Sequence, residues 1–431
     1  MNFDELKSFR LPSSFWKAFV ERHWEKAPTV IDRSIVHSNV VSCEDIHDAL
    51  RNGWNGVAIG KLEHPPHLYV GGHLRQLAAD ILPEVGESID QYMGRLARHF
   101  GTAELCIRMA RLHGALPAMF FRAREFLLEL LRLVGYPGGG VDTFAFYGTY
   151  LNSPARLHKD DASTFVFVGA GSKTYLTWPF EALAHLAPGI GRYGNHILRH
   201  VNYRDYLDLA TEIRGYAGDI IYLPASGWHI AIGDGAPSYT ANIAMFLPLH
   251  AQRQVLGELD RLLAHYGDLG KGAVVPLNAG SYVGCNNYGR VLHEAIENVL
   301  QVISAIEQHG ALRRALTIRH AAIVSAAGFR GPLSPYSGRD RGVNWNSTLC
   351  GSADHIVVPY FEEDGAQLVC ANGHAIIVED RDVCSKMTAA LNCGIPFCAR
   401  DICPANGKCD DYLDLLQRLS KVGAIAVDGQ L

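Results

Sequence analysis

The sequence predicts an α+β protein built around a double-stranded β-helix, a sandwich of two antiparallel sheets. Between residues 141 and 250, short runs rich in β-branched and aromatic residues follow one another at short intervals, separated by Gly, Pro and Asp. On both sides of this segment the apolar residues recur at helical spacing instead. We therefore expect a β-rich core between helical regions.

The first region, 1–140, is predicted to be a mainly helical segment that packs on the barrel, with isolated strands between Val30 and Leu82 in short apolar runs such as 56–59. Its clearest helix spans 120–134 and ends at the glycine- and proline-rich run 135–140. The charged residues of this helix are expected on its solvent face: Arg122, Arg124, Glu125, Glu129 and Arg132.

The double-stranded β-helix core is predicted over 141–250, with strands at 143–150, 164–168, 174–178, 219–223 and 239–247. Helical periodicity then returns in 251–266 and 290–327, broken near Gly310, so 251–330 is expected to be a helical linker or dimerisation region. The glycine-, proline- and serine-rich stretch 331–342 precedes a final unit, 343–431. In that unit we expect strands over 355–360 and 367–378 and a helix over 411–422.

Composition narrows the class of protein and of partner. The 431 residues are 48% hydrophobic and 19% charged, enough apolar material for one large domain and smaller ones. A net charge of −5 supplies no basic field, which argues against nucleic acid as a partner. No stretch approaches the roughly 20 apolar residues of a membrane span, and the N-terminus lacks the pattern of a secretory signal. We therefore expect a cytoplasmic protein with no membrane partner.

The ten cysteines include seven after residue 349. Four of these form a short run in which a structural zinc ion is conceivable if their sulfurs converge: Cys393, Cys398, Cys403 and Cys409. Their spacings are wider than the usual CxxC pair, so free thiols in a loop-rich segment are the favoured interpretation, and a disulfide is a third.

The chemistry of the core concentrates at His158 and Asp160. Residues i and i+2 of a strand point to one face, so this His-x-Asp pair can point together into a barrel. An imidazole and a carboxylate so placed are two thirds of the facial triad that holds iron(II). Asp161 is a rival carboxylate but should face the other way.

The third ligand is predicted to be His229, which ends the run 218–229. In this run a Gly-Asp turn precedes an apolar strand that ends at Leu223-Pro224, and a Gly-containing bend then leads to Trp228 and His229. Three other histidines, His185, His196 and His200, compete for the role. They fall in a glycine- and proline-containing insertion without a strand and bend that would aim them inward. We predict a metal site of His158, Asp160 and His229.

Lys173 begins the strand that follows the His-x-Asp pair. A cosubstrate that chelates iron through a 2-oxo acid leaves a distal carboxylate in the barrel, which needs a cationic or hydroxyl partner once it is desolvated. The residues alone leave this role and that of a solvated strand-edge lysine equally open.

The segment 141–247 resembles the Jumonji-C and cupin-like 2-oxoglutarate oxygenases, through the His-x-Asp pair, the Gly-Asp-to-Trp-His run and Lys173. The resemblance implies iron(II), 2-oxoglutarate as cosubstrate and O2. It also implies that Lys173 binds the distal carboxylate of 2-oxoglutarate, that Asn242 approaches the metal-bound cosubstrate, and that Tyr147 or Thr149 hydrogen-bonds its other end.

The run from Phe15 and Trp16 through His23, Trp24 and Glu25 to Pro28 is similar to the entry motif of the ribosomal-oxygenase branch. That branch implies a homodimer through the helices after the barrel and a winged-helix-like C-terminal domain. The cysteine-rich insertion at 393–409 departs from its pattern and puts the substrate in doubt.

Three functions follow as hypotheses. The favoured one is hydroxylation of an amino-acid side chain in a protein or peptide, such as a natural-product precursor. The second is hydroxylation of a free amino acid or small metabolite. The third is a metal-binding cupin without oxygenase activity, or a binding module.

Overall fold

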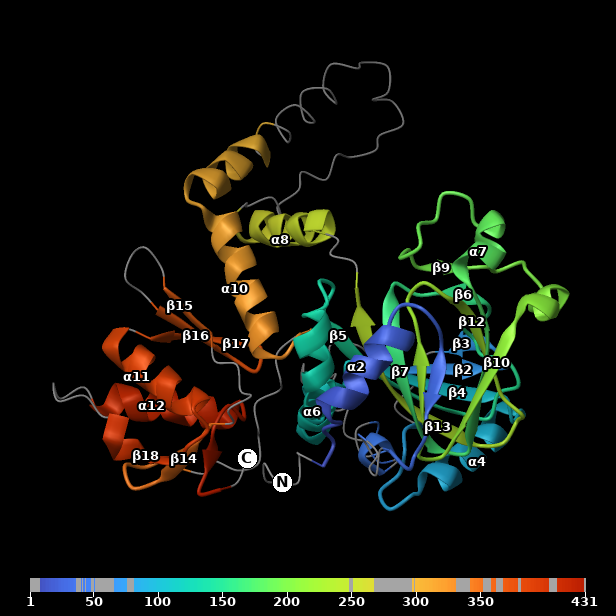
Figure 1. Cartoon of the computed structure of the whole chain (residues 1–431), viewed down its shortest axis with the longest axis horizontal. Coiled ribbons are helices and arrows are strands. Elements are labelled where there is room, and N and C mark those ends of the chain that lie inside the picture. The colour runs from blue at the N-terminus through green and yellow to red at the C-terminus, as the bar shows by residue number, and fades with distance from the viewer. Residues whose placement is uncertain are drawn as a thin grey trace, which may run out of the picture. The chain divides into compact units, whose positions relative to one another are not determined.

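The computed structural model describes residues 8–35, 40, 42, 44–47, 50, 66–75, 81–247, 251–266, 297, 299–330, 342–351, 358–361, 367–378, 381–402 and 409–429. The chain forms two compact units, residues 1–248 with 322–431, and residues 249–321 (Figure 1). Expected strands such as 56–59 lie outside the described residues.

The larger sheet of the first unit is antiparallel and contains eight strands among the described residues. Their spatial order is β1 (Thr29–Ile31), β11 (Ile220–Leu223), β7 (Ala162–Ala170), β13 (Ser238–Phe246), β5 (Val141–Gly148), β4 (Leu105–Ala110), β2 (His67–Val70) and β3 (His73–Arg75).

The smaller sheet is also antiparallel, and its described strands lie in the order β10 (Thr211–Tyr216), β8 (Ser172–Trp178), β12 (Trp228–Ile232), β6 (His158–Lys159) and β9 (His196–Ile197). The two sheets face each other across a small apolar core, in which Val166 and Ile221 of the larger sheet meet Tyr175 and Ala231 of the smaller one. This confirms the predicted antiparallel sandwich of the cupin-like type.

Helices cover the outer face of the larger sheet: α2 (Ser13–Arg22), α4 (Ile89–Phe100) and α6 (Pro117–Val134) contribute to one core with its strands. Trp16 is fully buried there, edge-on to Phe126 of α6 at 5.2 Å and to Phe165 of β7 at 5.8 Å between ring centroids. The entry motif therefore fixes α2 against the outer face of the larger sheet, mainly by aromatic burial.

Helix α6 differs from its prediction in one respect. Arg124 and Glu125 were expected to be solvent-exposed, but they are 1% and 3% exposed. Glu125 accepts a hydrogen bond of 2.6 Å from Arg10, and Arg124 donates one of 3.4 Å to Asn372. The helix is enclosed on more than one side, so buried charges are paired instead of solvated.

The insertion between β8 and β10 covers the outer face of the smaller sheet. Its apolar residues Leu183, Ala187 and Leu198 pack with Trp178 and Trp228 in a separate core. The segment was expected to be loop-like, and it contains the short strand β9 and 3-10 turns.

The C-terminal residues have a core of their own. It includes helices α11 (Arg381–Asn392) and α12 (Cys409–Lys421) and residues from sheets β15–β16–β17 (Val358–Phe361, Gln367–Ala371, His374–Val378) and β18–β14–β19 (Phe397–Cys398, Thr348–Cys350, Ala426–Val427). The run 367–378, expected as one strand, is a hairpin. Asn372 and Gly373 both have positive φ, as a two-residue hairpin turn requires.

The second unit contains α8 (Ala251–Tyr266) and most of α10 (Ala311–Ser325), in the region predicted to be helical. Glu258 of α8 lies 2.5 Å from Arg261 and 3.6 Å from Arg319 of α10. The expected homodimer through this region stays a prediction. Among the described residues, no helix is long and apolar enough to cross a membrane.

Candidate metal centre

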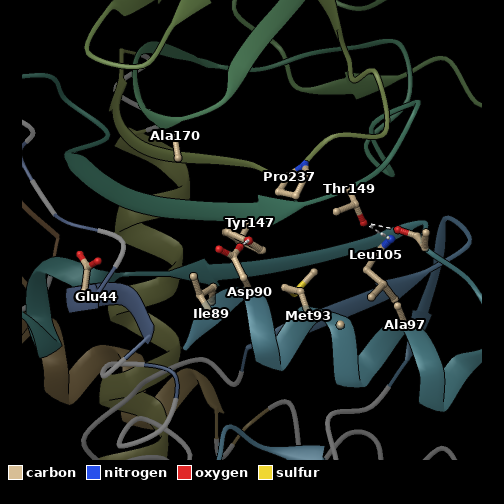
Figure 2. Close-up of a pocket in the computed structure, with 12 residues that line it drawn as sticks. Glu44, Ile89, Asp90, Met93, Ala97, Leu105, Tyr147, Thr149, Ala170 and Pro237 are labelled. Atoms are coloured by element: carbon tan, nitrogen blue, oxygen red, sulfur yellow. Dashed lines mark hydrogen bonds between the residues drawn. The ribbon is translucent and has the colours of Figure 1, made fainter. Parts of the chain in front are cut away.

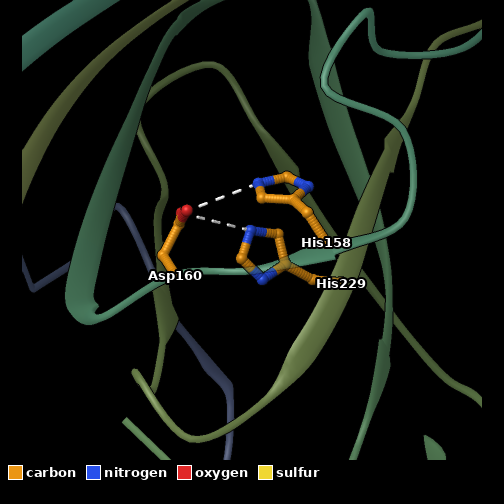
Figure 3. Close-up of side chains that lie close together, drawn as sticks. All are labelled: His158, Asp160 and His229. Atoms are coloured by element: carbon orange, nitrogen blue, oxygen red, sulfur yellow. Dashed lines mark ion pairs between the residues drawn. The ribbon is translucent and has the colours of Figure 1, made fainter. Parts of the chain in front are cut away.

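Strand pairing brings the three predicted ligands together. His158 on β6 lies directly opposite His229 on β12 in the antiparallel register, so both side chains project from the same face of the smaller sheet. Asp160 follows His158 by two residues and shares that face. Its Oδ2 lies 3.6 Å from Nε2 of His158 and 3.7 Å from Nε2 of His229 (Figure 3).

The potential ligand atoms of these three residues all lie within 4.8 Å of one another. Among the described residues, they form the group of His, Cys, Asp or Glu side chains that could hold a metal ion. His158 Nδ1 is 2.9 Å from the carbonyl oxygen of Arg156, and His229 hydrogen-bonds the backbone at Gly227. Such contacts hold each imidazole in the tautomer that leaves Nε2 free as a ligand.

The electrostatics of the cluster favour an ionised carboxylate. Burial opposes the charge of Asp160, but the adjacent His158 and His229 outweigh it and hold the pKa of Asp160 well below its usual value. Burial lowers the pKa of His229 to about 3, with the neighbouring His158 adding to the shift. The Asp160 side chain remains 35% exposed, so a ligand can reach it. The centre offers one carboxylate and two imidazoles to a cation.

Lys173 lies on the same inner face as the triad. Thr177 of β8 is directly opposite His229, and Tyr175 and Lys173 follow at two-residue steps along that face. The Tyr175 ring is 5.9 Å from that of His229. Lys173 is 4% exposed, and burial lowers its pKa to about 8. The position therefore differs from that of a solvated strand-edge lysine.

Tyr150 lies against Lys173, and the sequence analysis did not single it out. Its hydroxyl accepts a hydrogen bond from Lys173 Nζ, which also lies 4.5 Å from the centre of its ring. The tyrosine is 7% exposed and follows the end of β5. The period-two pattern could not place it, because the chain leaves the strand after Gly148.

Asn242 also faces the inside of the sandwich. It pairs with Phe144 of β5 and Val166 of β7, and Val166 belongs to the core between the sheets. The side chain is 7% exposed, and its Oδ1 has no hydrogen-bond partner among the described residues. A buried amide oxygen without a partner is costly unless something binds it.

Tyr147 and Thr149 lie elsewhere. The Tyr147 side chain projects from the opposite face of β5, where its hydroxyl donates a 2.6 Å hydrogen bond to Asp90 of α4. Both residues line a cavity of about 590 Å³ between α4 and the sheet (Figure 2). The structure thus does not bring them to the inner site that the sequence analysis expected, because their neighbours Phe144 and Phe146 take the inner face.

The rival ligands do not join the triad. Asp161 and His200 are not part of the cluster. The His185 ring neighbours Tyr206, and that of His196 lies 6.2 Å from Trp228, on the side covered by the insertion. Near the triad, a cavity of about 560 Å³ is lined by His229 and Thr177, with Glu25, Pro224 and Ser226 at its wall.

The four cysteines of the zinc alternative fall partly outside the described residues, which omit Cys403 and the side chain of Cys409. Cys393 and Cys398 are free thiols that donate to the carbonyl oxygens of Ala390 and Trp345. Free thiols stay the favoured prediction for this segment, and zinc stays the alternative.

No family model and no curated protein sequence matches the chain. The chain is similar to the X-ray structure of ycfD from Escherichia coli, with a TM-score of 0.52 and 14% identity, covering 96% of this chain and 98% of that one. A structure of YcfD, described as a ribosomal oxygenase, has a TM-score of 0.47 and 14% identity over the same shares. The complex of YcfD with cobalt and 2-oxoglutarate has a TM-score of 0.45 at 14% identity, over the same shares. The likeness to ycfD shows a shared fold over nearly the whole chain, in agreement with the resemblance in the sequence.

Proposed function

We propose that the protein is an iron(II)- and 2-oxoglutarate-dependent oxygenase that hydroxylates an amino-acid side chain in a protein or peptide. The observation that carries the proposal is the placement of the triad and Lys173 on one inner face of the sandwich. A metal site by itself does not indicate oxygenase activity, because cupin proteins with other functions also bind metals. A buried lysine on the strand adjacent to β12, hydrogen-bonded to a tyrosine, adds a group that can bind a carboxylate on the same inner face.

The donor set fits iron(II). Two imidazoles and one carboxylate are the facial triad of non-haem iron oxygenases, and they leave positions open for a chelating cosubstrate and O2. Iron(II) with 2-oxoglutarate would supply the oxidation of a C–H bond. The part of His158, Asp160 and His229 is to hold the metal at the inner face, with both imidazoles fixed by backbone carbonyls.

The other inner residues would bind the cosubstrate. Lys173 and Tyr150 would both donate charge-assisted hydrogen bonds to the distal carboxylate of 2-oxoglutarate, one from an ammonium and one from a hydroxyl. Asn242, buried on the opposing inner face, would donate an amide N–H to its oxygen-bearing end. Tyr175, beside His229, would limit access of water to the metal.

A side chain of a larger substrate suits the cavity next to His229. Its volume of about 560 Å³ is larger than a single side chain needs, and His229 is part of its lining. YcfD, described as a ribosomal oxygenase, has the same fold. The C-terminal unit, which we propose to be winged-helix-like, would offer further surface for a protein substrate. Hydroxylation of a free amino acid would use the same metal centre. The two hypotheses are distinguished by testing whether peptides or free amino acids stimulate turnover.

The test is succinate release from 2-oxoglutarate in air with added iron(II), alone and with candidate peptides. We expect slow turnover without substrate in the wild type and none in His158→Ala. His185→Ala, a rival histidine away from the triad, serves as the matched control and should behave like the wild type. Absence of turnover together with absence of metal-dependent 2-oxoglutarate binding would leave a cupin-fold binding module as the better account.

A further inference from the structure

One basic side chain on the inner face is not used by the triad or by the proposed 2-oxoglutarate site. Arg108 of β4 lies directly opposite Phe146 of β5, and Phe146 is two residues from Phe144, the partner of the inward-facing Asn242. Strand pairing therefore places Arg108 on the same inner face as Asn242.

This part of the inner face is accessible. His67 and Tyr69 of β2 share it with Arg108, because His67 and Arg108 are directly paired. All three are half-buried, as are Phe144 and Phe146. The residues that alternate with them on the other face, such as Leu68 and Ile107, are at most 3% exposed. The result is a shelf of aromatic and basic side chains (His67, Tyr69, Arg108, Phe144 and Phe146) that a ligand can reach.

The guanidinium of Arg108 is oriented but unpaired. Its Cζ lies 4.8 Å from the centre of the Phe144 ring, which fixes its direction by a cation–π contact. Among the described residues it has neither a hydrogen-bond nor an ion-pair partner, although it is close enough to Asp160 to help hold the pKa of that carboxyl down. A guanidinium carries five N–H donors in a planar fork that matches a carboxylate.

Asp160 does not remain available as its partner once the centre is loaded. A divalent metal, the Asp160 carboxylate, the 2-oxoglutarate dianion and the Lys173 ammonium together carry no net charge. Arg108 then adds a positive charge with no counterion beside the reaction centre. Electrostatic complementarity therefore favours binding of an anionic group beside Arg108 on the shelf.

We propose that Arg108 binds a carboxylate of the primary substrate, most simply an Asp or Glu side chain close to the residue that is hydroxylated. The inference rests on the proposed oxygenase function and adds a substrate class to it. Phe144 and Phe146 would flank the bound segment, and Arg108 would set its position relative to the metal. Arg108 is a specificity residue in this account, and 2-oxoglutarate is bound by Lys173 instead.

The test uses the full chain loaded with Zn(II) and 2-oxoglutarate, so that no turnover occurs. Three fluorescent pools of N-acetylated, C-amidated hexapeptides serve as probes, with central residues Asp or Glu, Asn or Gln, and Lys or Arg. In fluorescence anisotropy we expect the wild type to bind the acidic pool roughly tenfold or more tightly than the neutral pool. Arg108→Gln should lose this preference, and Arg108→Lys should retain part of it.

Three controls keep the outcomes distinct. Arg75→Gln removes an exposed charge from β3 of the same sheet and should keep the preference. The metal content, 2-oxoglutarate affinity and melting temperature of Arg108→Gln should equal those of the wild type. Competition by free L-aspartate as effective as that by the acidic pool would overturn the assignment to a peptide side chain, because the ligand of Arg108 would then be a small-molecule carboxylate.

Equal binding of the acidic and neutral pools by the wild type, or an acidic preference that survives in Arg108→Gln, would overturn the inference. So would a loss of 2-oxoglutarate affinity in Arg108→Gln, because the arginine would then serve the cosubstrate. Failure of the proposed function looks different, since the wild type would then bind neither metal nor 2-oxoglutarate.

Discussion

Lys173 donates a hydrogen bond to the hydroxyl of Tyr150 on the inner face that also carries His229. Both side chains are nearly inaccessible to bulk water, at 4% and 7% exposed. A buried ammonium paired only with neutral oxygen is poorly compensated, so a carboxylate that reached it would gain a strong charge-assisted interaction.

The first prediction compares two tyrosines near the end of β5. Tyr150→Phe removes a hydrogen-bonding hydroxyl from the proposed site and should raise the Kd of 2-oxoglutarate roughly tenfold or more, because a hydrogen bond to a charged group contributes about 1.5–3 kcal/mol. Tyr147→Phe removes the hydroxyl that bonds Asp90 on the other face and should leave the Kd unchanged. Titration calorimetry with Zn(II) present measures both. A larger rise in Kd for Tyr147→Phe than for Tyr150→Phe would show that Tyr147, and not Tyr150, binds 2-oxoglutarate.

The second prediction concerns pH. Burial lowers the pKa of Lys173 to about 8, so in the ligand-free protein the side chain is charged below that pH and neutral above it. Binding of the 2-oxoglutarate carboxylate favours the charged form, so the affinity should be level below about pH 8 and fall by up to about tenfold per pH unit above it. Lys173→Arg stays charged throughout and should show no such fall. The same slope in both proteins would show that another group titrates.

The third prediction uses a backbone contact. A Cβ added at Gly233 would lie 2.0 Å from the carbonyl oxygen of Tyr150, so Gly233→Ala must displace the segment that carries the tyrosine. We expect weaker 2-oxoglutarate binding with metal binding retained. Gly191→Ala, where nothing lies within 4 Å, is the control and should match the wild type in both assays. Unchanged 2-oxoglutarate affinity in a folded Gly233→Ala protein would show that the position of Tyr150 is immaterial.

The fourth prediction concerns the entry motif. Trp16 is completely buried between α6 and β7, so Trp16→Ala should lower the free energy of unfolding by about 3–5 kcal/mol. Leu133→Ala truncates a side chain of α6 that is 41% exposed and should change it by no more than about 0.5 kcal/mol. Urea denaturation followed by tryptophan fluorescence and circular dichroism compares them. A small effect at Trp16 would mean that α2 contributes little to the core.

The sequence predicted the sandwich and the triad because both depend on local patterns. His158 and Asp160 share a face through two-residue alternation, and the bend at 224–227 returns the chain to His229. Tyr150 and Arg108 were not predicted. The first lies beyond a strand end, and the second lies on a strand whose place in the sheet depends on long-range pairing with β5.

Other differences between the predicted and the observed structure also arise where local sequence patterns do not determine the structure. The strand over 143–150 was expected to present Tyr147 inward, but inward and outward cannot be distinguished when both faces of a strand are buried. The hairpin at 372–373 carries an Asn-Gly pair, a turn signal that could have divided the expected strand. The burial of Arg124 and Glu125 depends on partners 248 and 115 residues away in sequence, which periodicity alone does not show.

Chelation of iron(II) by a 2-oxo acid produces a visible charge-transfer absorption band, and recording this band without oxygen probes the proposed centre directly. We expect the band when iron(II) and 2-oxoglutarate are added to the wild type, at one equivalent of each. Asp160→Ala should show no band, and Lys173→Met should need roughly tenfold or more 2-oxoglutarate to develop it. A wild type that binds iron(II) without developing the band, or an unchanged band in Asp160→Ala, would refute the proposed iron and 2-oxoglutarate site.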